Sequence, residues 1–213
     1  NATMTITAAQ FEQRPLFQPQ QREQWACQYR IPNLLVSRNG VVFALPEERV
    51  NSVADDAKHH LVLRRSFDHG RTWTDLEVLF ADDNPRVSHS YGGGVADLET
   101  GRVFIFVGIG VVIGPDDIGG AWPEKWKSEH PEEATALRKK LAPHVDTGRY
   151  MIWTDDGGET WSEPLPLGDT LHVINPVTGE KRGFHPQFTG IQLRHGPHKG
   201  RLVIPGRGRT QGA

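Results

Sequence analysis

An eight-residue pattern occurs twice in this chain of 213 residues and constrains its fold more than any other feature. Residues 66–73 read SFDHGRTW and residues 154–161 read TDDGGETW, so both copies fit Ser/Thr-x-Asp-x-Gly-x-Thr-Trp. Each copy follows an apolar segment of strand length. In such a turn the Asp carboxylate accepts hydrogen bonds from backbone N–H groups, Gly permits positive φ, and the Trp side chain packs over the turn. The repeat therefore predicts an all-β protein built from similar units.

Short apolar segments separated by turn residues continue this pattern along the chain, which contains 23 Gly and 15 Pro. The segments 34–36 and 41–43 flank Asn39-Gly40, a strong hairpin signal because both residues tolerate positive φ. The segments 94–96 and 103–107 form a second pair, and 191–193 and 201–204 a third. Together with the repeat, this series predicts a β-propeller.

Two segments depart from the strand series. Residues 1–24 are polar and rich in Gln, and we expect an N-terminal arm there. Residues 114–147 are expected to form an insertion between two strands, with a helix over 131–141 (PEEATALRKKL). Proline and acidic residues suit its first turn, and basic residues suit its last turn. The insertion is equally compatible with a plain surface excursion and with a role in lining a substrate site.

Composition excludes several classes of function. The chain has 24 Lys plus Arg against 26 Asp plus Glu, a formal net charge of -2, which argues against a generally basic nucleic-acid binder. Its longest apolar run, residues 103–113, is too short to span a bilayer, so no transmembrane segment is expected. Cys27 is the only cysteine, and the histidines lack a ligand spacing. We therefore expect no metal site and no cofactor.

The repeated pattern resembles the Asp-box of the sialidase superfamily. On this resemblance the structural Asp-box residues are Asp68, Gly70, Trp73, Asp156, Gly158 and Trp161. Residues 29–32 (YRIP) resemble the Arg-Ile-Pro motif of exo-sialidases. Arg30, Arg49, Asp55 and the first repeat follow in the order and approximate spacing of bacterial and animal sialidases.

This resemblance implies a six-bladed β-propeller of sialidase type. Residues 25–213 would supply about the first two and a half blades, with blades over 25–80 and 86–167 and half a blade over 184–206. The C-terminal half of the propeller is expected on a second chain or in a missing segment. That half would hold the family's glutamate, two further arginines and a Tyr nucleophile.

The implied activity is that of an exo-sialidase-type glycoside hydrolase, which releases terminal sialic acid or a related acidic sugar from a sialylated glycan. By resemblance, Arg30 is the first of three arginines that hold the substrate carboxylate, and Arg49 contacts the ring substituents. Asp55 is the acid/base, provided that its pKa is raised, and Asp56 is the alternative if the alignment slips by one residue.

Residues 88–92 (SHSYG) stand where the family often has an Asp-Pro pair that helps to read the sugar's substituents. The exact sugar therefore stays open. Two alternative functions also remain. One is a non-catalytic Asp-box propeller that binds carbohydrate, and the other is a superfamily relative, such as a lyase, that acts on another acidic polysaccharide. We favour a secreted, periplasmic or lysosomal location, although residues 1–10 show no signal-peptide pattern.

Overall fold

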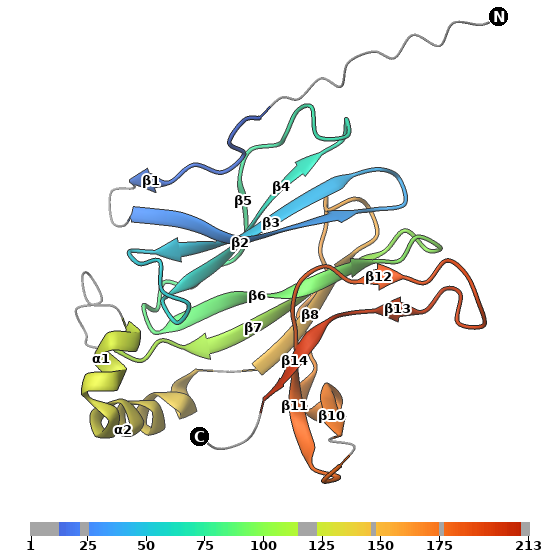
Figure 1. Ribbon diagram of the computed structural model, residues 1–213. Coiled ribbons are helices and arrows are strands. Elements are labelled where there is room, and N and C mark those ends of the chain that lie inside the picture. Colours follow the sequence, from blue (N-terminus) through green and yellow to red (C-terminus); the bar gives the residue numbers. More distant parts are fainter. Residues whose placement is uncertain (1–12, 22–25, 115–122, 146–147, 175–176, 210–213) are drawn as a thin grey trace, which may run out of the picture.

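The computed structural model describes residues 13–21, 26–114, 123–145, 148–174 and 177–209, and they form antiparallel sheets flanked by two helices (Figure 1). The prediction of an all-β fold with a short helical insertion is confirmed. The expected N-terminal arm lies largely outside the described residues. The number of blades in a complete ring stays a prediction.

Two larger sheets carry most of the structure. The first has the order β1(Gln20–Gln21), β2(Ala26–Val36), β3(Val42–Val50), β4(His59–Ser66), β5(Glu77–Phe80). The second has the order β6(Val87–Ala96), β7(Val103–Val111), β8(Gly148–Thr154), β9(Leu165–Pro166). In both, neighbours in the sheet are neighbours in the sequence, as expected for hairpin-connected strands.

The third unit is smaller. Its main sheet has the order β10(His172–Ile174), β11(Lys181–Pro186), β14(Gly206–Arg209). The strands β12(Ile191–Gln192) and β13(Leu202–Val203) pair separately. This unit therefore begins at His172, earlier than the residue 184 expected from the sequence, because the three residues of β10 are too few to show a strand pattern.

The hairpins and the longer helix form where the sequence placed them. Val36 pairs with Val42, Ala96 with Val103, and Ile191 with Val203. The helix α2(Pro131–Leu141) has the predicted bounds. The preceding helix α1(Pro123–Glu129) was not predicted, because seven residues are too few to show a helical period. Two short 3₁₀ turns follow, at Ala142–His144 and Gly168–Thr170.

The hydrophobic core lies between the first two sheets. It is formed by buried side chains of β2, β3, β4, β6, β7 and β8: Leu35, Phe43, Leu45, Leu61, Leu63, Tyr91, Val103, Ile105, Val107 and Ile152. Along β2 the exposure alternates, so that Leu35 is buried between exposed Leu34 and Val36. Nearly all of β3 and β4 is buried, because both faces of these strands are covered.

The three units meet at a repeated backbone feature. Ile31, Gly93 and Phe188 all have positive φ, at 51°, 90° and 65°. The register of β2 shifts beside Ile31, and that of β6 shifts beside Gly93, as in β-bulges. Gly94 pairs with Thr189 in a parallel bridge, and the Thr189 hydroxyl donates to the Leu34 carbonyl at 3.0 Å. Thr189 thus joins β2 of the first sheet and β6 of the second to the third unit.

The two sequence repeats fold into the same turn. In the first, the Thr72 hydroxyl donates to Asp68 Oδ2 at 2.6 Å, and the Gly70 amide donates to the Ser66 hydroxyl at 2.8 Å. In the second, the Thr160 hydroxyl donates to Asp156 Oδ2 at 2.6 Å. These hydrogen bonds favour the carboxylate form and lower the pKa of both aspartates. The assignment of these turns as Asp-boxes of the superfamily stays a prediction.

The remaining residues of the repeats tie the turns to the sheets. Trp73 Nε1 donates to the Gly70 carbonyl at 3.1 Å. Trp161 lies edge-on to Phe43 of the core, with ring centroids 6.3 Å apart. Gly158 has φ 91° and packs closely against the first sheet. The second repeat therefore helps to hold the two large sheets together.

Candidate functional site

The predicted acid loop and the insertion lie at the same end of the sheets. Residues 51–58 follow β3, and the insertion follows β7, the corresponding strand of the second sheet (Figure 1). The two repeats follow β4 and β8. These strands run antiparallel to β3 and β7, so they end at the opposite end of the sheets. The loops that carry the predicted site residues and the turns of the two repeats thus lie at opposite ends of the sheets.

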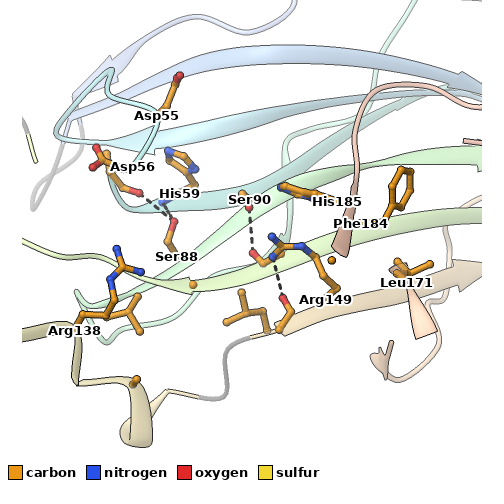
Figure 2. Close-up of a pocket in the computed structure, with 18 of the residues that line it drawn as sticks. Asp55, Asp56, His59, Ser88, Ser90, Arg138, Arg149, Leu171, Phe184 and His185 are labelled. Atoms are coloured by element: carbon orange, nitrogen blue, oxygen red, sulfur yellow. Dashed lines mark hydrogen bonds between the residues drawn. The ribbon is translucent and has the colours of Figure 1, made fainter. Parts of the chain in front are cut away.

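Ser88 of β6 fixes the acid loop to the second sheet. Its hydroxyl accepts the backbone N–H of His59 at 2.9 Å and donates to the Ala57 carbonyl at 3.1 Å (Figure 2). His59 is buried, and its Nε2 lies 3.3 Å from the Ala54 carbonyl oxygen. Burial lowers the pKa of His59, which favours the neutral ring. The loop carrying Asp55 is therefore anchored at its base.

The structure brings Arg30, Arg49 and Asp55 together. Arg49 lies at the end of β3, and its Nη1 contacts Asp55 Oδ1 at 2.7 Å, while its Nη2 contacts Glu47 Oε2 at 3.0 Å. Arg30, which leaves β2 beside the bulge, donates to the Val53 carbonyl at 3.0 Å. Arg49 donates to the same carbonyl. Both arginines are thus anchored to the loop that carries Asp55.

The Arg49 guanidinium lowers the pKa of Asp55, mainly through the hydrogen bond between them. The side chain of Asp55 is 73% exposed, whereas that of Arg49 is 2% exposed. A general acid needs a raised pKa, so the direction of the shift in the free protein is opposite to the one that this role requires. Asp56, the alternative acid, forms an ion pair with Lys127 of α1.

A small cavity of about 210 Å³ lies beside this cluster. It is lined by Ile31, Glu47, Arg49, Asp55, Ser90, Tyr91, His185, Gln187, Phe188 and Arg207. The lining comes from β2, β3 and the loop 51–58 of the first unit, from β6 of the second, and from β11, β14 and residues 187–188 of the third. Tyr91 is buried and its pKa is raised by desolvation, so its hydroxyl stays neutral. Predicted and unpredicted residues thus share one cavity.

A larger cavity of about 760 Å³ begins at the same place and extends under the insertion (Figure 2). It shares Asp55, Ser90 and His185 with the small cavity. Its far wall includes Lys127 of α1 and Arg138 of α2. Of the two roles left open for the insertion, that of lining a cavity is the one that the structure favours.

Several lining residues were not found by sequence reasoning: Glu47, Ser90, Arg149, His185 and Arg207. Glu47 lies two residues before Arg49, on the same face of its strand, and this spacing was the one available signal. Arg149 lies over Gly108, where a Cβ would come within 2.8 Å of its Nη1. Strand pairing and packing between units bring the others to the site.

Within the described ranges, no group of three or more His, Cys, Asp or Glu side chains is arranged to hold a metal ion. Among the same residues, no helix is both long and apolar enough to cross a membrane.

The chain is similar in sequence to bacterial sialidases. A sialidase of Micromonospora viridifaciens is 31% identical over 177 residues, covering 82% of this chain and 24% of the relative. A sialidase of Paraclostridium sordellii is 29% identical over 151 residues, covering 67% of this chain and 31% of the relative. The chain therefore spans about a quarter to a third of these relatives. No protein-family model matches it.

The fold agrees with the sequence similarity. The intramolecular trans-sialidase from Ruminococcus gnavus superposes with a TM-score of 0.57 at 18% identity, over 85% of this chain and 56% of that protein. The curated relatives and this shared fold place the chain in the sialidase superfamily.

Proposed function

We propose that the protein containing this chain is an exo-sialidase-type glycoside hydrolase that releases a terminal sialic acid or a related acidic sugar. The observation that carries this proposal is the convergence of Arg30, Arg49 and Asp55 on the loop 51–58, beside a cavity. An acidic sugar needs a cationic partner for its carboxylate and a proton donor for its leaving oxygen. These residue types stand together here.

Arg30 binds the carboxylate of the substrate. Its guanidinium carries five N–H donors, and the Val53 carbonyl accepts from one of its two terminal nitrogens. The side chain is exposed, so a ligand can reach it. The strained φ of Ile31 and the adjacent bulge set the direction in which Arg30 leaves β2. Arg30 is one member of the carboxylate clamp, and the two other arginines are expected outside this chain.

Arg49 contacts the substituents of the sugar ring. Its own orientation is fixed by Glu47, whose carboxylate is buried beside it. A buried guanidinium held in this way loses little side-chain freedom when a ligand binds, which favours affinity. Glu47 is therefore a positioning residue that acts through Arg49.

Asp55 is the acid/base, and the substrate itself restores the pKa that this role needs. In the free protein Arg49, and at longer range Arg30, stabilise the Asp55 carboxylate. A bound substrate brings a second carboxylate close to Asp55 and shares the positive charge of both guanidinium groups. The added negative charge raises the pKa of Asp55, so that it can protonate the leaving oxygen. A Tyr nucleophile is expected outside this chain.

The lowered pKa of Asp55 in the free protein also favours a second candidate function, a non-catalytic propeller that binds acidic carbohydrate. A third candidate acts on another acidic sugar or polysaccharide. It is favoured by the small cavity, because Ser90 and Tyr91 belong to the segment that departs from the family pattern and both line that cavity.

Release of free sialic acid from sialyllactose by the full-length protein distinguishes these candidates. We expect release by the wild type, and a KM at least about tenfold higher for Arg30→Ala, because a charge-assisted hydrogen-bond pair to the carboxylate is lost. Binding of sialyllactose without release would favour the non-catalytic candidate. Neither binding nor release, with activity on another acidic glycan, would favour the third.

A further inference from the structure

The larger cavity described above carries an inference about what lies beyond the cleaved bond. A general acid must come within hydrogen-bond reach of the leaving oxygen. The sugar to be released lies on one side of that oxygen, and the rest of the glycan lies on the other. Because the two cavities meet at Asp55, a ligand that occupies the small cavity continues into the larger one.

The charges around the larger cavity are unequal. Its two carboxylates already have cationic partners, since Asp55 is paired with Arg49 and Asp56 with Lys127. Arg138 of α2 faces the same space from the opposite wall (Figure 2), and no carboxylate within the described ranges lies at ion-pair distance from it. The lining therefore includes one guanidinium, that of Arg138, whose charge is not paired with a carboxylate of the described residues.

Arg138 also lies close to another cation. Its charge contributes, after desolvation, to the lowered pKa of Lys127. An anion that binds beside Arg138 relieves this repulsion. This wall is formed by the insertion and is anchored to the loop 51–58 by the Lys127–Asp56 ion pair.

The cavity also has room for a sugar ring. Gly110, Gly168 and Gly183 belong to its lining, and a Cβ at any of them would meet no atom within 4 Å. Ser88 and Ser90 line the same wall as Asp55, and although their hydroxyl groups donate to the Ala57 and Gly108 carbonyls, each oxygen can still accept a hydrogen bond. An open backbone surface with a few polar side chains suits a hydroxylated ligand of about one sugar unit.

We propose that this larger cavity binds the glycan unit beyond the glycosidic oxygen, and that Arg138 selects an anionic substituent on that unit. The substituent is the carboxylate of a second acidic sugar or a sulfate ester, which share the chemistry that a guanidinium recognises. This inference rests on the proposed function, because Asp55 marks the position of the bond that is cleaved.

The test compares three substrates of the full-length protein: sialyllactose, a sialic acid dimer, and sialyllactose sulfated on the galactose. The variants are Arg138→Gln and a matched control, Lys140→Gln, which removes a charge from an exposed position of the same helix that does not line the cavity. We expect Arg138→Gln to lower kcat/KM about tenfold for the anionic substrate that fits, and less than about twofold for sialyllactose. Lys140→Gln should leave all three unchanged.

The substrate that loses activity identifies the source of the anion. Equal losses on all three substrates, or no loss on either anionic one, would overturn the inference while leaving the hydrolase function intact. If no substrate is cleaved, the hydrolase proposal fails. The inference is then tested by equilibrium binding of the sialic acid dimer to the wild type and to both variants. Affinity for the dimer that is weakened by Arg138→Gln and unaffected by Lys140→Gln supports it, and equal affinity in all forms overturns it.

Discussion

Arg49, which is almost fully buried at the end of β3, holds the exposed carboxylate of Asp55 through an Nη1–Oδ1 contact of 2.7 Å. The same guanidinium contacts Glu47 at 3.0 Å. One buried cation thus links an interior carboxylate to a carboxylate on the surface. This relationship connects the stability of the first sheet to the chemistry of the acid loop, and it can be tested from both sides.

Arg49→Ala should destabilise the protein by about 3 kcal/mol, because it leaves the Glu47 carboxylate buried without its guanidinium partner. Urea unfolding at pH 7 measures this change. Arg30→Ala is the matched control, since Arg30 is exposed and donates a hydrogen bond to the Val53 carbonyl. It should cost less than about 1 kcal/mol. Equal costs for the two variants would contradict the role of the Glu47–Arg49 pair.

Asp55 should contribute to stability only above acidic pH. Its pKa is lowered on folding, so the folded protein binds this proton less readily than the unfolded chain does. The contribution is complete above about pH 4, the usual pKa of Asp, and is lost as the pH falls through the folded pKa. Solvent screening keeps it below about 1 kcal/mol.

Comparing the unfolding free energies of wild type and Asp55→Asn from pH 7 to pH 2 isolates the contribution of Asp55, because the other titrating groups are common to both proteins. The wild type should be the more stable form at neutral pH, and the difference should shrink toward zero in acid. A stability difference that grows as the pH falls would reverse the sign of the pKa shift.

Gly158→Ala should cost about 3 kcal/mol. The added Cβ would lie 2.8 Å from Arg65 Cδ and 3.0 Å from Phe43 Cε1, at a φ of 91°. Gly101→Ala is the control, because Gly101 has φ 90° but no atom within 4 Å of the added Cβ. It carries only the backbone penalty of about 1 kcal/mol. Thermal or urea unfolding of both variants tests whether the second repeat is packed against the first sheet.

Ile31→Gly should be tolerated better than Val36→Gly, although both remove a β-branched, exposed residue from β2. Val36 is an extended strand residue, and glycine there should cost about 1 kcal/mol. Ile31 has φ 51°, which glycine adopts without strain, so its replacement should cost less than half as much or stabilise the protein. Similar losses in the unfolding free energy would mean that Ile31 stores no strain.

Local patterns were sufficient to predict the hairpins and the helix of the insertion. Gly40 forms the turn with a φ of 82°, and the charge arrangement of 131–141 marks both ends of a helix. The order of Arg30, Arg49 and Asp55 also indicated one site, and the three residues do lie together.

The rest depends on contacts between distant parts of the chain. Arg207 reaches the small cavity from β14, and Lys127 reaches the larger one by pairing with Asp56 across more than sixty intervening residues. No spacing along the sequence encodes such contacts. The contact with Arg49 that lowers the pKa of Asp55 is likewise visible only in the folded chain.

The most direct test of the central claim is the effect of Asp55→Ala on two sialosides that differ in their need for a proton. Lactose is a poor leaving group and 4-nitrophenolate is a good one. With Asp55 as the general acid, we expect release from sialyllactose to fall by about 10²–10⁴-fold, and release from 4-nitrophenyl sialoside to fall less than about tenfold. Equal losses on both substrates, or unchanged release from sialyllactose, would contradict the assignment of Asp55 as the acid.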